Sequence, residues 1–144
     1  MKTVIASIHA DYVQHIFDGS KKYEIRKTAP DKAPFEVLIY ETKKRRPIEH
    51  VNLQGRGMVV GKFVCNKIEI FSTFFGVKES QLKRISKGSC LTIDELTAYE
   101  RGRGSAMLFA WHIADVEVFS VPIPVEKYCK RPPQSYCYVR GAEK

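Results

Sequence analysis

The stretch 58–70 is the part of the chain that most constrains its fold. Valine, isoleucine and phenylalanine dominate it, and β-branched and aromatic residues at this density favour a strand. Gly61 lies inside the stretch and Cys65-Asn66-Lys67 interrupts its apolar pattern, so we expect one long strand that is bent near Gly61 or broken at 65–67. A bent strand is typical of a sheet that curls into a barrel.

Further strands and several helices are predicted on both sides of this stretch. Strands are expected at 3–8, 23–26, 35–40, 106–113, 116–121 and 136–140, helices at 10–18, 77–86 and 92–100, and a helical turn at 125–128. Thr92-Ile93-Asp94-Glu95 has the pattern of a capping box, which opens the third helix. No repeat, low-complexity tract or linker divides the chain. We therefore expect a single α+β domain over residues 1–144, with the last two helices paired on one face of the sheet.

The segment Gly19-Ser20-Lys21-Lys22-Tyr23-Glu24-Ile25-Arg26 concentrates charge beside a predicted strand. Gly19 is well placed to end the preceding helix in the left-handed conformation. Because side chains alternate along a strand, Tyr23 and Ile25 are expected to face a core. The opposite surface would then carry Lys22, Glu24 and Arg26, with Lys21 leaning over it.

Two interpretations of this charged strand follow from the residues alone. The first is an edge strand with a solvated face of surface ion pairs, which is a common arrangement. The second is a functional site in which Lys21, Lys22 and Arg26 keep Glu24 ionised. A carboxylate held in this way can accept a proton, orient a water molecule or receive an N–H donor of a base.

The charge of the whole chain favours a polyanionic partner. The formal net charge is +8 and the isoelectric point is near 9.4, which suits nucleic acid first and an anionic membrane surface second. No stretch is long and apolar enough to span a membrane, and the first residues lack the pattern of a signal peptide. We expect a cytoplasmic protein that does not associate with membranes.

The cysteines and histidines show no spacing typical of a metal site. Cys65, Cys90, Cys129 and Cys137 lie far apart without a Cys-x-x-Cys pair, and the four histidines show no ligand spacing beside them. We therefore expect reduced, structural thiols, no metal and no cofactor.

The pattern Gly19-x-Lys21-x-x-Glu24-x-Arg26 resembles the signature of the ASCH family, a branch of the PUA-like β-barrels associated with RNA. Other segments stand in the order in which that family has them: Ser7-Ile8 with Tyr12, 37–42, 59–63, 96–99, 116–119 and 131–136. The resemblance covers about Thr3 to Val139. It implies a PUA-like mixed β-barrel with peripheral helices, and RNA as partner, with DNA as a second candidate.

The resemblance also implies a ligand site in a cleft between the barrel and the first helix. In this chain Lys21, Glu24 and Arg26 would line that cleft, with Lys22 beside them. Weaker candidates for the cleft wall, each with simple packing as the alternative, are Tyr40, Thr42, Ser135 and Tyr136. Tyr40 and Tyr136 are also candidates for stacking on a base.

Two basic loops are candidates for contact with phosphates. The run Lys43, Lys44, Arg45 and Arg46 could contribute a salt-sensitive affinity that is independent of sequence. Arg101 and Arg103 alternate with glycines, and such loops combine flexibility with guanidinium groups. For either loop the alternative is a solvated surface without a ligand.

Three functions remain open from the sequence. The leading one is binding of RNA or a nucleotide-like ligand in the cleft. The second is a small hydrolase acting on RNA or a modified nucleoside, with Glu24 as general base and Lys21 as its electrostatic partner. The third is a protein adaptor in transcription or translation.

One activity of the resembled family fits this chain poorly. Some members are amidases that remove an acyl group from a modified cytidine, and their nucleophile is a threonine where this chain has Glu24. A carboxylate cannot replace a hydroxyl nucleophile without a different covalent intermediate. The threonine-dependent reaction is therefore not expected here.

Overall fold

The computed structural model describes residues 1–43, 55–102 and 107–139. Its strands are β1 (Lys2–His9), β2 (Tyr23–Arg26), β3 (Phe35–Thr42), β4 (Met58–Phe71), β5 (Leu108–Ile123) and β6 (Tyr136–Tyr138). Its helices are α1 (Ala10–Phe17), α2 (Glu79–Ser89) and α3 (Ile93–Arg101), with a short 3₁₀ helix at Val125–Lys127.

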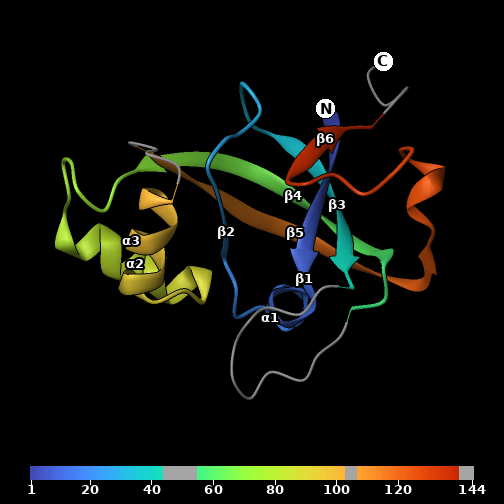
Figure 1. Ribbon diagram of the computed structural model, residues 1–144, viewed down its shortest axis with the longest axis horizontal. Helices are drawn as coiled ribbons and strands as arrows, with labels where there is room; N and C mark the ends of the chain where they lie inside the picture. The colour runs from blue at the N-terminus through green and yellow to red at the C-terminus, as the bar shows by residue number, and fades with distance from the viewer. Residues whose placement is uncertain (44–54, 103–106, 140–144) are drawn as a thin grey trace.

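The six strands form one mixed sheet in the order β2-β5-β4-β3-β1-β6. β1 and β3 run parallel, and the other neighbours are antiparallel. The sheet curls into a half-barrel, with α2 and α3 together at one end and α1 beside the ends of β1 and β3 (Figure 1). The expectation of an α+β, PUA-like mixed barrel with peripheral helices is confirmed, and the curl stays open between the edge strands β2 and β6.

β4 is one continuous strand, so the bent alternative is right and the broken one is wrong. Its pairing with β5 shifts register between Val59 and Gly61, and again within 62–67. Such irregularities increase the local bend and twist of a strand. At Gly61 a β-carbon would lie 2.5 Å from the carbonyl oxygen of Glu117 and 2.8 Å from the ring of Phe17. Only glycine allows α1 and β5 to approach β4 this closely.

β5 is also continuous, which corrects the prediction of two strands at 106–113 and 116–121. Ala114 pairs with Val64 and Glu117 pairs with Lys62, so residues 115 and 116 lie opposite Phe63 alone. Asp115 has φ of 49°, and one extra residue in a strand is typical of a β-bulge. The polar interruption is absorbed by the bulge and does not end the strand.

The helices lie close to their predicted positions. Gly19, with φ of 85°, follows α1 in the left-handed conformation. Thr92 and Glu95 form the expected capping box of α3. α2 starts and ends slightly later than predicted, and Cys90 follows it with φ of 62°. Buried Ile85 of α2 and Leu96 of α3 belong to one apolar cluster with Ile25, Phe71, Leu108 and Ala110 of the sheet, so the pairing of these two helices on the sheet is confirmed.

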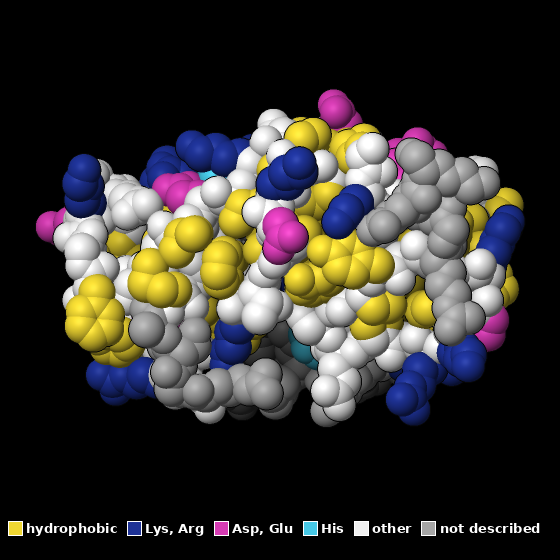
Figure 2. Space-filling view, turned by 90° about the horizontal axis from the view of Figure 1, so that it is seen from above, with side chains coloured by type: hydrophobic (Ala, Val, Ile, Leu, Met, Phe, Trp, Pro, Cys, Tyr) yellow, Lys and Arg dark blue, Asp and Glu magenta, His cyan; other side chains and the backbone are white. Residues whose placement is uncertain are grey.

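Two further apolar clusters fill the rest of the core. One lies under α1 and includes Val13, Ile16, Phe63 and Trp111. The other lies near the 3₁₀ helix and includes Ile5, Leu38, Tyr40, Val59 and Val125. Within the described ranges, no helix is long and apolar enough to cross a membrane. On the face in Figure 2, Lys and Arg side chains are dispersed among hydrophobic ones and form no continuous basic surface.

Candidate functional site

β2 places Glu24 and Arg26 on one side of the sheet and Tyr23 and Ile25 on the other. Ile25 is buried in the cluster under α2 and α3, and Tyr23 packs against that cluster, so the predicted alternation is confirmed. Glu24 and Arg26, however, are only 6% and 7% exposed. The interpretation as a solvated edge strand is therefore wrong. Lys22 precedes the strand and is exposed, so it does not share their face.

Lys21, Glu24 and Arg26 form a buried ionic cluster. The Lys21 Nζ lies 3.5 Å from Glu24 Oε1, and the Arg26 Nη2 lies 2.8 Å from Glu24 Oε2. Lys21 is 2% exposed and its Nζ donates to the Ser89 carbonyl oxygen at 2.6 Å. Burial lowers the pKa of Lys21, although the charge of Glu24 opposes this shift.

Arg26 uses its guanidinium group to hold three parts of the chain together. Its Nε donates to Glu24 Oε2 at 3.0 Å within β2. Its Nη2 donates to the Ser7 carbonyl oxygen of β1 at 2.8 Å. Its Nη1 donates to the Ser135 carbonyl oxygen at 3.3 Å and to Ser135 Oγ at 3.1 Å. Each guanidinium nitrogen of Arg26 thus has a protein acceptor. Arg26 therefore serves mainly to hold these parts of the chain together, and it has no guanidinium nitrogen left without a protein partner for a ligand to bind.

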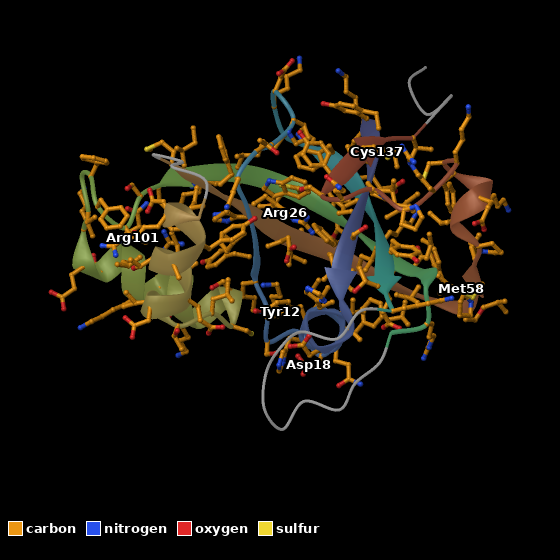
Figure 3. The ribbon with its side chains drawn as sticks, in the orientation of Figure 1. Tyr12, Asp18, Arg26, Met58, Arg101 and Cys137 are labelled. Atoms are coloured by element: carbon orange, nitrogen blue, oxygen red, sulfur yellow. The ribbon has the colours of Figure 1, made fainter. Side chains whose placement is uncertain are left out.

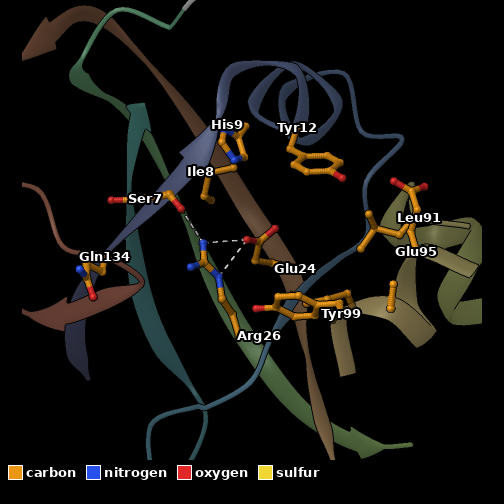
Figure 4. A pocket seen from close by; sticks show the side chains of 12 residues that line it. Ser7, Ile8, His9, Tyr12, Glu24, Arg26, Leu91, Glu95, Tyr99 and Gln134 are labelled. Carbon is orange, nitrogen blue, oxygen red and sulfur yellow. Dashed lines mark hydrogen bonds and ion pairs between the residues drawn. The ribbon is translucent and has the colours of Figure 1, made fainter. Parts of the chain in front are cut away.

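A cavity of about 470 Å³ opens over this cluster. Figure 4 shows Tyr12 and Tyr99 on different sides of the Glu24 carboxylate, with the Arg26 guanidinium beside that carboxylate. Tyr12 comes from α1 and Tyr99 from α3, and the Tyr99 residue is 37% exposed. The cavity is also lined by Ser7, Ile8, His9, Ile25, Leu91, Glu95, Ala98 and Gln134. Its size is in the range of pockets that hold small ligands.

Two lysine ammonium groups lie against the aromatic rings that line the cavity. The Lys21 Nζ lies 4.7 Å from the centre of the Tyr12 ring. The Lys27 Nζ lies 4.6 Å from the centre of the Tyr99 ring. Both distances are within the range of cation–π attraction, which fixes each ring against its neighbour.

The polar side chains that line the cavity include two carboxylates and one guanidinium group. Glu24 and Glu95 supply carboxylates, while the guanidinium of Arg26 is already engaged. Glu95 Oε1 also accepts from the Thr92 backbone N–H in the capping box, at 3.0 Å. An acceptor floor between aromatic walls suits a flat group that carries N–H donors.

None of the four predicted wall residues is among those that line the cavity, although Ser135 and Thr42 each contact a residue that does. Ser135 contacts Arg26 directly, as described above. The Oγ1 of Thr42 lies 3.3 Å from Nδ1 of His9, and His9 lines the cavity while Thr42 does not. Tyr136 packs edge-on against Trp111 with ring centres 5.2 Å apart, and burial raises the pKa of its hydroxyl. Tyr40 lies in the core near the 3₁₀ helix and does not line the cavity, which corrects its placement in the wall.

The predicted basic loops are described only in part. The Arg101 guanidinium lies 5.0 Å from the centre of the Phe74 ring, and Lys43 is exposed next to Gly57. Figure 3 shows Arg101 on the helical side of the molecule, away from Arg26. Lys44, Arg45, Arg46 and Arg103 lie outside the described residues. Their contact with phosphates stays a prediction.

Several cavity residues were missed by sequence reasoning. His9, Tyr12, Tyr99 and Gln134 line the cavity, but they lie outside the charged motif and form no charge pattern in the sequence. One signal was available for Tyr99, because Glu95 and Tyr99 are four residues apart on a helix and therefore share a face. No comparable local signal marks His9 or Gln134, whose places depend on the packing of β1 and β6.

A second polar network lies on the other face of β2. Glu69 accepts from Arg84 Nη2 at 2.6 Å and from Gln81 Nε2 at 2.8 Å, and its Oε1 lies 2.8 Å from His112 Nε2. Although burial opposes the shift, these hydrogen bonds lower the pKa of Glu69 to about 2. His112 is thus satisfied structurally. Among the described residues, no group of three or more His, Cys, Asp or Glu is placed to hold a metal ion.

The curled mixed sheet, with the charged motif at its pocket, defines a domain of the PUA-like class. The chain belongs to the ASCH domain family, whose family model matches residues 7–123. A comparison with curated proteins found no match.

Solved structures support the same fold. ASCH from Zymomonas mobilis is 20% identical, with a TM-score of 0.71 over 97% of this chain and 89% of that one. A tyrosine-to-phenylalanine mutant of the same protein gives 0.72 at 20% identity over 99% and 94%. The N-terminal domain of Staphylothermus marinus McrB is 14% identical, with a TM-score of 0.50 over 87% and 77%. At these identities the similarity shows the fold alone.

Proposed function

We propose that this ASCH domain binds RNA, or a nucleotide-like ligand, with one nucleobase inside the cavity. The observation that carries the proposal is the Glu24 carboxylate on the cavity floor, between the rings of Tyr12 and Tyr99. A nucleobase is flat, stacks on aromatic rings and presents N–H donors at its edge. It therefore matches both the walls and the floor.

The distribution of charge supports a base inside the cavity and phosphates outside it. Lys21 and Arg26 are bound to Glu24 and to backbone carbonyls, so little positive charge faces inward. Glu24 and Glu95 would repel a phosphate at the cavity floor. Lys27, next to Tyr99, provides a cation at the rim. With a net charge of +8, the remaining surface can attract a polyanion over longer distances.

Fluorescence anisotropy with a structured RNA and a matched DNA duplex, each at two salt concentrations, tests the proposal. Tyr99→Ala should weaken RNA binding by roughly tenfold, because stacking on one base contributes about 1–3 kcal/mol. Tyr138→Ala is the matched control, since Tyr138 is 43% exposed on β6 and does not line the cavity. Equal, strongly salt-dependent binding of both nucleic acids, unchanged in Tyr99→Ala, would contradict the proposal.

A hydrolase acting on RNA or a modified nucleoside is the second candidate. It is favoured by Lys21, which is buried beside Glu24 and has a lowered pKa. Glu24→Gln separates the two functions. Turnover by a Glu24 base should fall by orders of magnitude, whereas binding should hold or tighten, since glutamine keeps an acceptor oxygen and removes a negative charge. A folded variant with unchanged turnover and unchanged affinity would contradict both roles of the cavity.

A protein adaptor is the third candidate, and one observation favours it. Phe74, Phe75 and Val77 are exposed in the segment between β4 and α2, and exposed apolar side chains that lie together often mark a protein interface. An adaptor should keep a stable partner after nuclease treatment. Loss of every partner with nuclease would instead favour binding through RNA.

A further inference from the structure

Cys129 and Cys137 meet next to the 3₁₀ helix, although eight positions separate them in sequence. Both thiols are free and both pack against the cluster that contains Ile5 and Val125. Cys137 is fixed by the pairing of β6 with Ile5 of β1, and the Cys129 backbone N–H donates to the Val125 carbonyl oxygen at 3.0 Å. Both side chains thus lie against the same small cluster, and Cys129 is near enough to Cys137 to influence the pKa of its thiol.

The two thiols differ in their surroundings. Burial raises the pKa of the Cys137 thiol, and the adjacent Cys129 raises it further. Cys129 lines a surface depression of about 410 Å³, together with Glu126, Lys127, Tyr128, Lys130 and Tyr138. The thiol of Cys129 donates to the Arg131 carbonyl oxygen at 3.1 Å. Cys129 is therefore the thiol that a small molecule in the depression would meet.

The charges around this depression suit one kind of small molecule. Lys127 and Lys130 are exposed cations and Glu126 is an exposed carboxylate. A peptide disulfide such as glutathione disulfide carries several carboxylates and also ammonium groups, so it can pair with both signs.

We propose that Cys129 and Cys137 are a redox pair that reacts with small peptide disulfides of the glutathione type. The Cys129 thiolate attacks one sulfur of glutathione disulfide, whose S–S bond breaks and releases one glutathione. The Cys137 thiolate then attacks the Cys129 sulfur, forms the protein disulfide and releases the second glutathione. The two protons lost by the cysteines end on the two released glutathiones. The protein dithiol is oxidised and glutathione disulfide is reduced.

The bond would close a ring that contains residues 130–136, and we call residues 130–135 the C-terminal strap. The strap holds the cavity floor: the Ser7 Oγ donates to the Pro133 carbonyl oxygen at 2.6 Å, and Arg26 donates to Ser135. The Ser7 backbone N–H also donates to the Ser135 carbonyl oxygen at 3.0 Å. The redox state of the pair is thereby linked to the segment that anchors Arg26. The proposal does not depend on which ligand the cavity binds.

Incubation of the full chain in glutathione redox buffers, followed by alkylation and peptide mass analysis, tests the pair. Trypsin separates residues 128–130 from 131–140, since it cleaves after Lys130 and not between Arg131 and Pro132. Oxidation should join these two peptides in a linked pair that reductant separates. Cys137→Ser should stop at the first step and accumulate glutathione on Cys129.

Two further variants make the result decisive. In Cys129→Ser, the remaining Cys137 should be modified more slowly than Cys129 is in the parent, because burial raises the pKa of the Cys137 thiol and lowers its thiolate fraction. Cys90→Ser is the matched control, since Cys90 is also half-buried, and it should leave the 129–137 bond unchanged. Glutathione that reaches Cys90 as fast as Cys129, or linked peptides that never form, would overturn the proposal.

Discussion

Two carboxylates on opposite faces of the sheet, Glu24 of β2 and Glu69 of β4, each pair with an arginine, yet their surroundings differ. Glu24 lies among Lys21 and Arg26, and all three side chains are less than a tenth exposed. Glu69 lies between Arg84 and His112, and the Arg84 side chain is 46% exposed. The first cluster stands under a cavity with aromatic walls, whereas the second is covered by α2 and reached by water.

This difference shows that an ion pair alone does not identify a functional site. The Glu69 network connects β4, β5 and α2, and the oxygens of Glu69 are engaged by Gln81, Arg84 and His112. The Glu24 cluster costs more to bury, and it is placed where a small molecule can reach its carboxylate. Buried ionic groups next to a cavity are the better candidates for function.

The largest expected difference in the free energy of unfolding is between variants of Arg26 and of Arg84. Arg26→Met leaves Glu24 buried with one cation fewer and frees the Ser7 and Ser135 acceptors, so the free energy of unfolding should fall by about 3–5 kcal/mol. Arg84→Met should cost about 1 kcal/mol or less, because its ion pair is half-exposed. Urea unfolding of both variants measures the contrast. Equal losses would show that burial does not distinguish the clusters.

A smaller effect should be seen in acid. The folded-state pKa of Glu69 is about 2, below its ordinary value of 4.5, so its stabilisation is present above pH 4.5 and is lost as the pH falls towards 2. Glu69→Gln should therefore lower stability near neutral pH by roughly 2 kcal/mol, discounted for solvent screening, and flatten the acid limb. Unfolding midpoints between pH 2 and 7 measure this. Glu79→Gln on the exposed surface of α2 is the control, and an acid limb as steep in Glu69→Gln as in the parent would contradict the assignment.

The smallest effect should be seen in alkali. Burial holds the folded-state pKa of Lys21 below its ordinary 10.5, so the unfolded chain binds more protons in that window and stability should rise with pH there. One group contributes at most about 1.4 kcal/mol per pH unit. The difference in unfolding free energy between the parent and Lys21→Met, followed from pH 7 to 10.5, isolates this term. A constant difference would mean that Lys21 titrates as it does in the unfolded chain.

Much of the fold could be predicted because its signals are local. The alternation of Tyr23 and Ile25, the left-handed Gly19 and the capping box at Thr92 each depend on a few neighbouring residues. The prediction of a break near Asp115 was wrong because it too relied on local sequence alone. A bulge preserves the strand only because β4 continues beside it, and that support is not local.

The site was predictable in its charges but not in its walls. Lys21, Glu24 and Arg26 meet because their spacing along one strand and its preceding turn brings them together. The burial of Arg26 was not predictable, since Arg26 contacts Ser135, more than a hundred positions away. Tyr12 and Tyr99 likewise line the same cavity only because α1 and α3 pack on either side of it. Contacts of this range leave no periodic trace in a single sequence.

The contacts of Ser135 with Arg26 also set the order in which the site can form. The ribosome makes the charged motif early, and the sheet can pair from β1 to β5 before the strap exists. Arg26 gains its Ser135 acceptors only after residue 135 has been synthesised. A chain that stops before the strap would keep its ionic motif without the contacts that hold Arg26 at the cavity, so the complete site forms only after the segment 130–135 has been added.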